Sequence, residues 1–150
     1  MSVNLNATGD ARGVGGGRSE SAPAHSGGGR SLVETIRELA PELHFAPVTR
    51  VLGAVDELSP DVVDDLRAVL REALTNVARH ARARTAEVEL AVTDEQATLR
   101  VTDDGVGCAG APKDGGLADA RRRARWHGGG LTVEPGPAGG TRLTWTVPLR

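Results

Sequence analysis

The feature that most constrains this sequence is a stripe of apolar residues that begins after Ser59 and is spaced for one face of an α-helix. Ser59 is a preferred N-cap residue, Pro60 suits the first helical position, and Asp61 places negative charge in the first turn. The stripe has a period of about 3.6 residues and consists of Val62, Val63, Leu66, Val69, Leu70, Ala73, Leu74 and Val77. It predicts a long helix that ends near residue 81 or 83 and needs a sheet to lie on.

Alternating apolar and polar residues downstream predict that sheet. The apolar positions of a first β-hairpin, with its turn at 94–96, are Val88, Leu90, Val92, Leu99 and Val101. A helix over about 117–127 and a second hairpin over 131–133 and 143–147 follow, and a strand is expected within 45–55. Helices on one face of a mixed, mostly antiparallel sheet predict an α+β fold, a two-layer α/β sandwich.

The sequence divides into three parts. Residues 1–30 hold eight glycines and hardly any large apolar side chain, which predicts a disordered Gly-rich tail or linker. Residues 31–44 predict a short amphipathic helix, a possible connector, that stops at Pro41 because proline cannot continue the hydrogen-bond ladder. Residues 45–150 contain the hairpins and the long helix and are expected to form one domain.

Composition excludes several classes of function. The net charge of −2 offers no basic field for nucleic acid, and the aromatic content of 2% offers no base-stacking platform. Every apolar run is far shorter than the roughly 20 residues that cross a bilayer. The single Cys108 allows neither an internal disulfide nor a cysteine zinc cage. We therefore expect a cytoplasmic protein that does not bind nucleic acid or insert into membranes.

Polar residues on the long helix form the first candidate cluster. Glu72, Asn76 and His80 follow one another at spacings of four residues, and Arg79 lies three residues after Asn76. Helical geometry places such residues on neighbouring parts of one face. A carboxylate, an amide, an imidazole and a guanidinium can together activate a hydroxyl, ligate a hard metal ion and contact phosphate. A solvated helix face is the alternative interpretation.

Glycine-rich segments form the second candidate cluster. Asp103-Asp104-Gly105-Val106-Gly107 directly follows a predicted strand, where glycines allow a flat ligand to approach the backbone. Gly115-Gly116-Leu117 opens a predicted helix, whose N-terminal N–H groups would face any phosphate above them, and Gly139-Gly140-Thr141 joins two strands. Each segment taken alone is also compatible with ordinary turn chemistry.

In order and spacing, four segments resemble the N, G1, G2 and G3 boxes of GHKL ATPases. These segments are 71–81, 103–107, 116–117 and 139–141. More narrowly, they resemble the ATP-binding domain of sensor histidine kinases of the nitrate-sensor class. The resemblance implies a Bergerat fold that binds ATP and Mg²⁺ and supplies the γ-phosphate for histidine autophosphorylation.

The resemblance also implies roles for single residues. Glu72 would act as the acid or base near the γ-phosphate, Asn76 would ligate Mg²⁺, and Arg79 or His80 would contact phosphate. Asp103 would bind the adenine amino group. The remaining implied positions are Gly105 and Gly107 beside the base, Thr141 supporting Asp103, and Gly116 with Leu117 at the phosphate-side end of the lid.

Two departures from the family pattern bear on function. Asp114 stands where the G2 box usually has its first glycine, and a carboxylate there would repel triphosphate. The phosphoacceptor histidine of this class lies in a separate dimerisation helix pair, and His44 does not fit that role because it follows Pro41. The expected partners are therefore a histidine-containing dimerisation domain, in another domain or chain, and indirectly a response regulator. An anti-sigma-factor-like serine kinase and a non-catalytic, nucleotide-dependent binding module are the alternatives.

Overall fold

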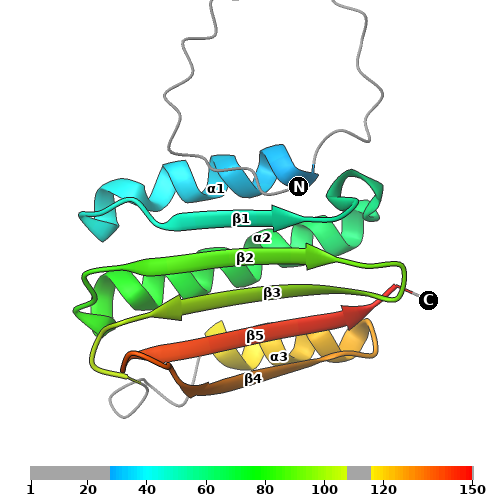
Figure 1. The fold of residues 1–150 in the computed structure, drawn as a ribbon. Coiled ribbons are helices and arrows are strands. Elements are labelled where there is room, and N and C mark those ends of the chain that lie inside the picture. The colour runs from blue at the N-terminus through cyan, green and yellow to red at the C-terminus, as the bar shows by residue number, and fades with distance from the viewer. Residues whose placement is uncertain (1–27, 108–115, 150) are drawn as a thin grey trace, which may run out of the picture.

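The structure, a computed structural model, describes residues 28–107 and 116–149. Its main elements follow in the order α1 (Gly28–Leu43), β1 (Val48–Leu52), α2 (Pro60–Asn76), β2 (Ala86–Val92), β3 (Gln96–Asp103), α3 (Gly116–Trp126), β4 (Gly130–Pro135) and β5 (Thr141–Pro148). A 3₁₀ turn, Val55–Glu57, precedes α2, and a π-helical turn, Val77–Ala81, continues it. Figure 1 shows the strands as one layer with α2 and α3 behind it, so the predicted α+β sandwich is confirmed.

The sheet has five strands in the order β1-β2-β3-β5-β4. Strand β1 is parallel to β2, and every other neighbouring pair is antiparallel. Both predicted hairpins are present, as β2–β3 and β4–β5 (Figure 1). Strand β5 lies between β3 and β4. Because β3 and β5 are antiparallel, with Thr102 opposite Arg142, the end of β3 and the start of β5 meet at the same end of the sheet.

Local sequence explains helix α2. The Ser59 hydroxyl accepts a hydrogen bond from the N–H of Val62 at 3.4 Å, and Pro60 opens the first turn. The predicted apolar stripe is the buried face, apart from the half-buried Val63. The helix ends after the π-helical turn at Arg82, whose φ of 49° is left-handed. The predicted end near residue 81 or 83 is therefore confirmed.

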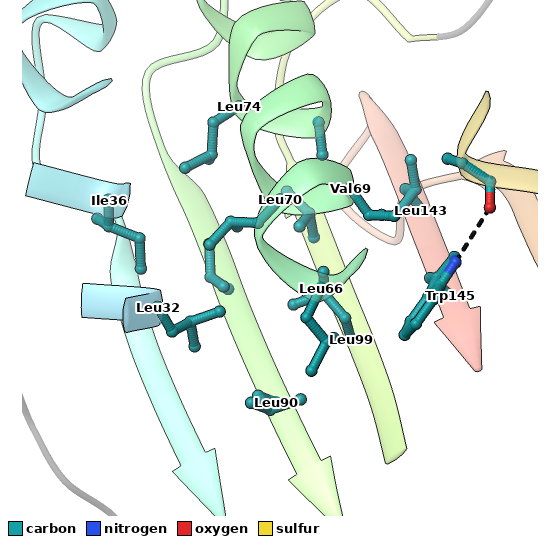
Figure 2. Packing of buried hydrophobic residues seen from close by; sticks show 14 of the residues in the cluster. Leu32, Ile36, Leu66, Val69, Leu70, Leu74, Leu90, Leu99, Leu143 and Trp145 are labelled. Carbon is teal, nitrogen blue, oxygen red and sulfur yellow. Dashed lines mark hydrogen bonds between the residues drawn. The ribbon is translucent and has the colours of Figure 1, made fainter. Parts of the chain in front are cut away.

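The core lies between α2 and the sheet. Figure 2 shows leucines of α2 pointing toward Leu90 and Leu99 on the strands, and Trp145 belongs to the same buried cluster. Burial of each such side chain contributes about 1.5–3 kcal/mol. Trp145 is fully buried, and its Nε1–H donates to the backbone carbonyl of Ala120 at 3.1 Å (Figure 2). That bond links α3 to the interior strand β5.

The prediction that α1 stops at Pro41 is wrong, because α1 runs through it to Leu43 and starts at Gly28, ahead of the predicted Ser31. Proline disrupts the ladder only locally, and here it lies within the last turn. That turn is held by Leu43, which is buried in the same core as Leu39. The core thus includes a helix that precedes the predicted boundary at residue 45. The predicted tail covers residues 1–30. Residues 1–27 lie outside the described residues, and residues 28–30 form the first turn of α1 instead of a tail.

The outer face of the sheet is polar. Strands β2 and β3 alternate between buried and half-buried residues. On the outer face, Arg100 of β3 pairs with Glu89 of β2 at 3.3 Å, and the hydroxyls of Thr98 on β3 and Thr146 on β5 lie 3.4 Å apart. The apolar core lies on the opposite, helix-covered face.

No helix within residues 28–107 and 116–149 has the length and apolar content of a membrane span.

Candidate functional site

The first predicted cluster lies at the C-terminal end of α2. Glu72 and Asn76 are both half-buried on this helix, one turn apart. Arg79 follows in the π-helical turn with an exposed side chain. His80 lies in the same turn, but its side chain is outside the described part of the structure. The backbone thus brings the four positions to one end of the domain.

Glu72 lies directly against the first residue of α3. A Cβ atom placed on Gly116 would fall 1.8 Å from the carboxyl carbon of Glu72. Because Arg123 near the other end of α3 pairs with Asp65 near the start of α2, the two helices run in opposite directions. The free N–H groups of the α3 N-terminus therefore lie near the last turns of α2. Leu117, half-buried, packs against the core and anchors that end of α3.

The second predicted cluster centres on Asp103, one of the few buried polar side chains described. Its Oδ1 accepts a hydrogen bond from the N–H of Gly105 at 2.8 Å, and the backbone N–H of Thr141 also donates to its carboxyl group. Burial raises the pKa of Asp103 and outweighs these two bonds, which lower it, while the nearby charge of Asp104 adds to the rise. The result is a carboxyl group held in one orientation.

Close backbone approach explains the glycines around Asp103. A Cβ on Gly140 would lie 2.1 Å from the backbone oxygen of Asp103, and one on Gly107 would lie 3.3 Å from the carbonyl oxygen of Gly140. Both glycines have left-handed φ angles, 71° and 85°. The two loops, far apart in the sequence, are therefore packed against each other, and only glycine fits at these contacts.

Asp104 makes backbone contacts that could not be predicted from the sequence. Its Oδ1 accepts hydrogen bonds from the N–H groups of Arg84 at 2.8 Å and Thr85 at 2.9 Å. These bonds lower the pKa of Asp104. The signal available in the sequence was the Asp-Asp pair itself. Successive residues in extended backbone point to opposite sides, so Asp103 and Asp104 serve different surroundings.

The donor set near Asn76 restricts which metal ion fits. Among the described residues no group of three His, Cys, Asp or Glu side chains lies close enough together to hold a metal ion. A half-buried amide oxygen on Asn76, with Glu72 one turn away, suits an ion that keeps most of its waters and takes few protein ligands. Mg²⁺ behaves in this way, so the residues fit it. Asp114 lies outside the described residues.

The fold and these clusters define an ATP-binding domain of the GHKL type. Residues 61–150 match the family described as histidine kinase-, DNA gyrase B-, and HSP90-like ATPases, and the chain belongs to this family. Within it, the relatives are sensor histidine kinases, so the chain carries an ATP-binding catalytic domain of the two-component sensor kinase type. The family resemblance found in the four segments is confirmed.

Individual relatives have the same character. The sensor histidine kinase NarS of Mycobacterium tuberculosis is 37% identical over an alignment that covers 81% of this chain and 35% of NarS. The sensor histidine kinase YxjM of Bacillus subtilis is 30% identical over 120 residues, 80% of this chain and 29% of YxjM. The chain thus spans about a third of the length of these relatives.

Solved structures support the fold. The ATP binding domain of PrrB from Mycobacterium tuberculosis aligns with a TM-score of 0.58 and 21% identity, over 79% of this chain and 91% of that one. The histidine kinase domain of a blue-light activated kinase from Erythrobacter litoralis aligns with a TM-score of 0.60 and 24% identity, over 79% of this chain and 59% of that one. At these identities the likeness concerns the fold alone.

Proposed function

We propose that this domain binds Mg²⁺–ATP and supplies its γ-phosphate to a histidine located in another domain or chain. One observation carries the proposal. A carboxyl group fixed among glycine backbones, Asp103, and a half-buried carboxylate beside a helix N-terminus, Glu72, belong to the two segments that the family resemblance assigns to the two ends of ATP.

The Asp103 end suits adenine. The exocyclic amine of adenine donates hydrogen bonds, and a buried carboxyl group already oriented by two backbone N–H groups offers an acceptor without further ordering. Gly105 and Gly107 lack side chains that would obstruct a flat base. The Thr141 N–H holds Asp103 from the opposite loop, which favours the supporting role expected for Thr141.

The α2 end suits the phosphates. The N-terminus of α3, at Gly116 and Leu117, presents N–H groups and the positive end of a helix dipole. Arg79 adds an exposed guanidinium that can reach a phosphate oxygen, and His80 is proposed as a second contact. Asn76 would hold Mg²⁺, which would supply neutralisation of phosphate charge.

Glu72 is proposed as the residue nearest the chemistry. Its carboxylate lies against Gly116, and therefore beside the helix end at which we place the γ-phosphate. From there it is positioned to accept the proton of an attacking nucleophile or to orient that nucleophile. The nucleophile is an imidazole nitrogen of the acceptor histidine. The exposed His44, which has a left-handed φ of 61° just after α1, is not proposed for this role.

The partners follow from the part of the relatives that this chain does not span. We propose a histidine-containing dimerisation domain as the phosphate acceptor and, one transfer further on, a response regulator. The named relatives are sensor kinases. Because the reaction uses ATP, we also propose a cytoplasmic location for this domain.

Calorimetric titration of the full chain with a Mg²⁺–ATP analogue tests the adenine site. We expect binding between about −8 and −4 kcal/mol and loss of at least about tenfold in affinity for Asp103→Asn. The matched control is Asp94→Asn, an exposed aspartate in the β2–β3 turn. Equal binding by Asp103→Asn and the parent would remove Asp103 from the proposal.

Phosphotransfer is tested separately by adding labelled ATP and a matching dimerisation domain. Acid-labile phosphohistidine that disappears in Glu72→Ala supports the proposed reaction. Acid-stable phosphoserine on a partner would instead indicate a serine kinase. Nucleotide binding without any transfer would indicate a binding module.

A further inference from the structure

Asp104 joins two segments that are separated along the chain. It directly follows β3, and its Oδ1 accepts the N–H groups of Arg84 and Thr85 at 2.8 and 2.9 Å. The N–H of Asp104 in turn approaches the carbonyl oxygen of Thr85 at 3.4 Å. One residue therefore holds the backbone of residues 84–85 through both its side chain and its main chain.

Residues 84–85 follow shortly after the helix that carries the proposed phosphate end of the site. Helix α2 ends in the π-helical turn Val77–Ala81, and the chain then reverses at Arg82 with its left-handed φ of 49°. A π-helical turn followed by a left-handed non-glycine residue is a sparsely populated backbone, which persists only where the surroundings hold it. The bonds to Asp104 lie two and three residues after this reversal, at Arg84 and Thr85.

The strand on the other side of the contact carries the adenine end. Asp103, the neighbour of Asp104, is held separately by the N–H groups of Gly105 and Thr141. Asp104 itself is only half-buried, so its side chain adds little to the core. Its contacts instead link the end of β3, beside Asp103, to the segment that follows α2 and its π-helical turn, which carry Asn76 and Arg79.

We propose that Asp104 is a positioning residue that fixes the phosphate-binding end of α2 relative to the adenine-binding Asp103. This inference rests on the proposed function. It predicts a specific defect, since adenosine needs only the Asp103 end whereas Mg²⁺–ATP must reach both ends at once. Loss of the tether therefore weakens binding of the triphosphate more than binding of the nucleoside.

The variants Asp104→Ala and Asp104→Asn test the tether in the full chain. The alanine variant removes the acceptor oxygen, while the asparagine variant keeps Oδ1 and can accept both N–H groups. For Asp104→Ala we expect affinity for a Mg²⁺–ATP analogue to fall about tenfold or more, and affinity for adenosine to change by less than about threefold. Asp104→Asn is expected to restore most of the triphosphate affinity. Calorimetry measures the first ligand and NMR titration the second.

A merely structural role would give a different pattern. If Asp104→Ala weakens both ligands equally, or neither, the positioning role is wrong, and the same holds if Asp104→Asn behaves like Asp104→Ala. Should the alanine variant not fold, Asp104→Glu keeps the charge but displaces the acceptor by one methylene group, and the same unequal loss is expected. Asp94→Ala, in an exposed turn, is the control and should leave both affinities unchanged.

Failure of this inference is distinguishable from failure of the proposed function. A parent chain that binds neither ligand overturns the nucleotide site, and the positioning role falls with it. A parent that binds both ligands, together with an Asp104→Ala variant that does the same, overturns only the role of Asp104.

Discussion

The carboxyl group of Glu72, on α2, lies against Gly116, the first residue of α3, so closely that a Cβ on the glycine would fall 1.8 Å from the carboxyl carbon. Gly116→Ala should therefore displace the Glu72 side chain, whose flexible stem can swing away at little cost to stability. If Glu72 acts as proposed, we expect phosphotransfer to fall by about tenfold or more. Labelled ATP with a dimerisation domain measures this loss.

The matched control for Gly116→Ala is Gly130→Ala, because nothing lies within 4 Å of a Cβ at Gly130. That variant should keep the activity of the parent. Thermal unfolding should show both variants within about 0.5 kcal/mol of the parent. Full activity in Gly116→Ala would show that the position of Glu72 does not matter for transfer.

Helix α2 and both hairpins could be predicted because their signals are local. An apolar stripe with an N-cap at Ser59 specifies one helix, and strict alternation on each side of a short turn specifies a hairpin. The order of the strands could not be predicted in the same way. The insertion of β5 between β3 and β4 depends on pairings such as Leu99 with Trp145, between residues far apart in sequence.

The candidate site could likewise be predicted only where its signals are local in the sequence. The residue types and their order along the chain identified the segments, and the structure brings Gly107, Gly140 and Asp103 together as the segments suggest. The partners of Asp104 could not be foreseen, because Arg84 and Thr85 offer only backbone N–H groups, which every residue but proline has. The continuation of α1 past Pro41 was missed because the burial of Leu43 is a tertiary effect.

The hydrogen bond from Trp145 to Ala120 predicts that substitution of Trp145 lowers stability more than substitution of Trp126. Trp145→Phe removes the Nε1–H donor at 3.1 Å and leaves space in the core, so we expect the free energy of unfolding to fall by about 2–3 kcal/mol. Trp126→Phe is the control, because Trp126 is 85% exposed, and it should change stability by less than about 0.5 kcal/mol. Urea unfolding followed by circular dichroism measures both. Equal effects would contradict the assigned contact.

The pKa of Asp103 predicts how stability depends on pH. Because burial raises this pKa above its ordinary value of 3.8, the folded protein binds the proton more tightly than the unfolded chain. The contribution of this group to stability is therefore fully present below 3.8 and is lost as the pH rises through the raised pKa. An asparagine side chain does not titrate, so the stability of Asp103→Asn relative to the parent should increase as the pH rises across this window.

Denaturant unfolding of the parent and Asp103→Asn, from below pH 3.8 to neutral pH, measures that change. Asp104 is present in both proteins, so its lowered pKa, which changes stability with pH in the opposite direction, is common to both. A stability difference that stays constant with pH, or that moves toward the parent as the pH rises, would contradict the raised pKa.

The contacts of Asp65 between α2 and α3 predict a measurable contribution to the free energy of unfolding. Its carboxylate pairs with Arg123 and, at 2.7 Å, with Nε2 of His127, whose ring lies edge-on to Trp145 with centroids 6.4 Å apart. Asp65→Ala removes both bonds, and we expect a loss of about 1–3 kcal/mol in the free energy of unfolding. The neighbouring, exposed Asp64 is the matched control, and Asp64→Ala should stay within about 0.5 kcal/mol of the parent.

The Asp65 variant also tests whether the two helices act as a unit. Asp65 and Glu72 contact α3 at opposite ends, through Arg123 and Gly116 respectively. If the Asp65 contacts set the register of α3, Asp65→Ala should weaken Mg²⁺–ATP analogue binding under conditions where the variant remains folded, because the α3 N-terminus then shifts against Glu72. Unchanged affinity in a folded Asp65→Ala would mean that Gly116 and Leu117 hold the N-terminus of α3 by themselves.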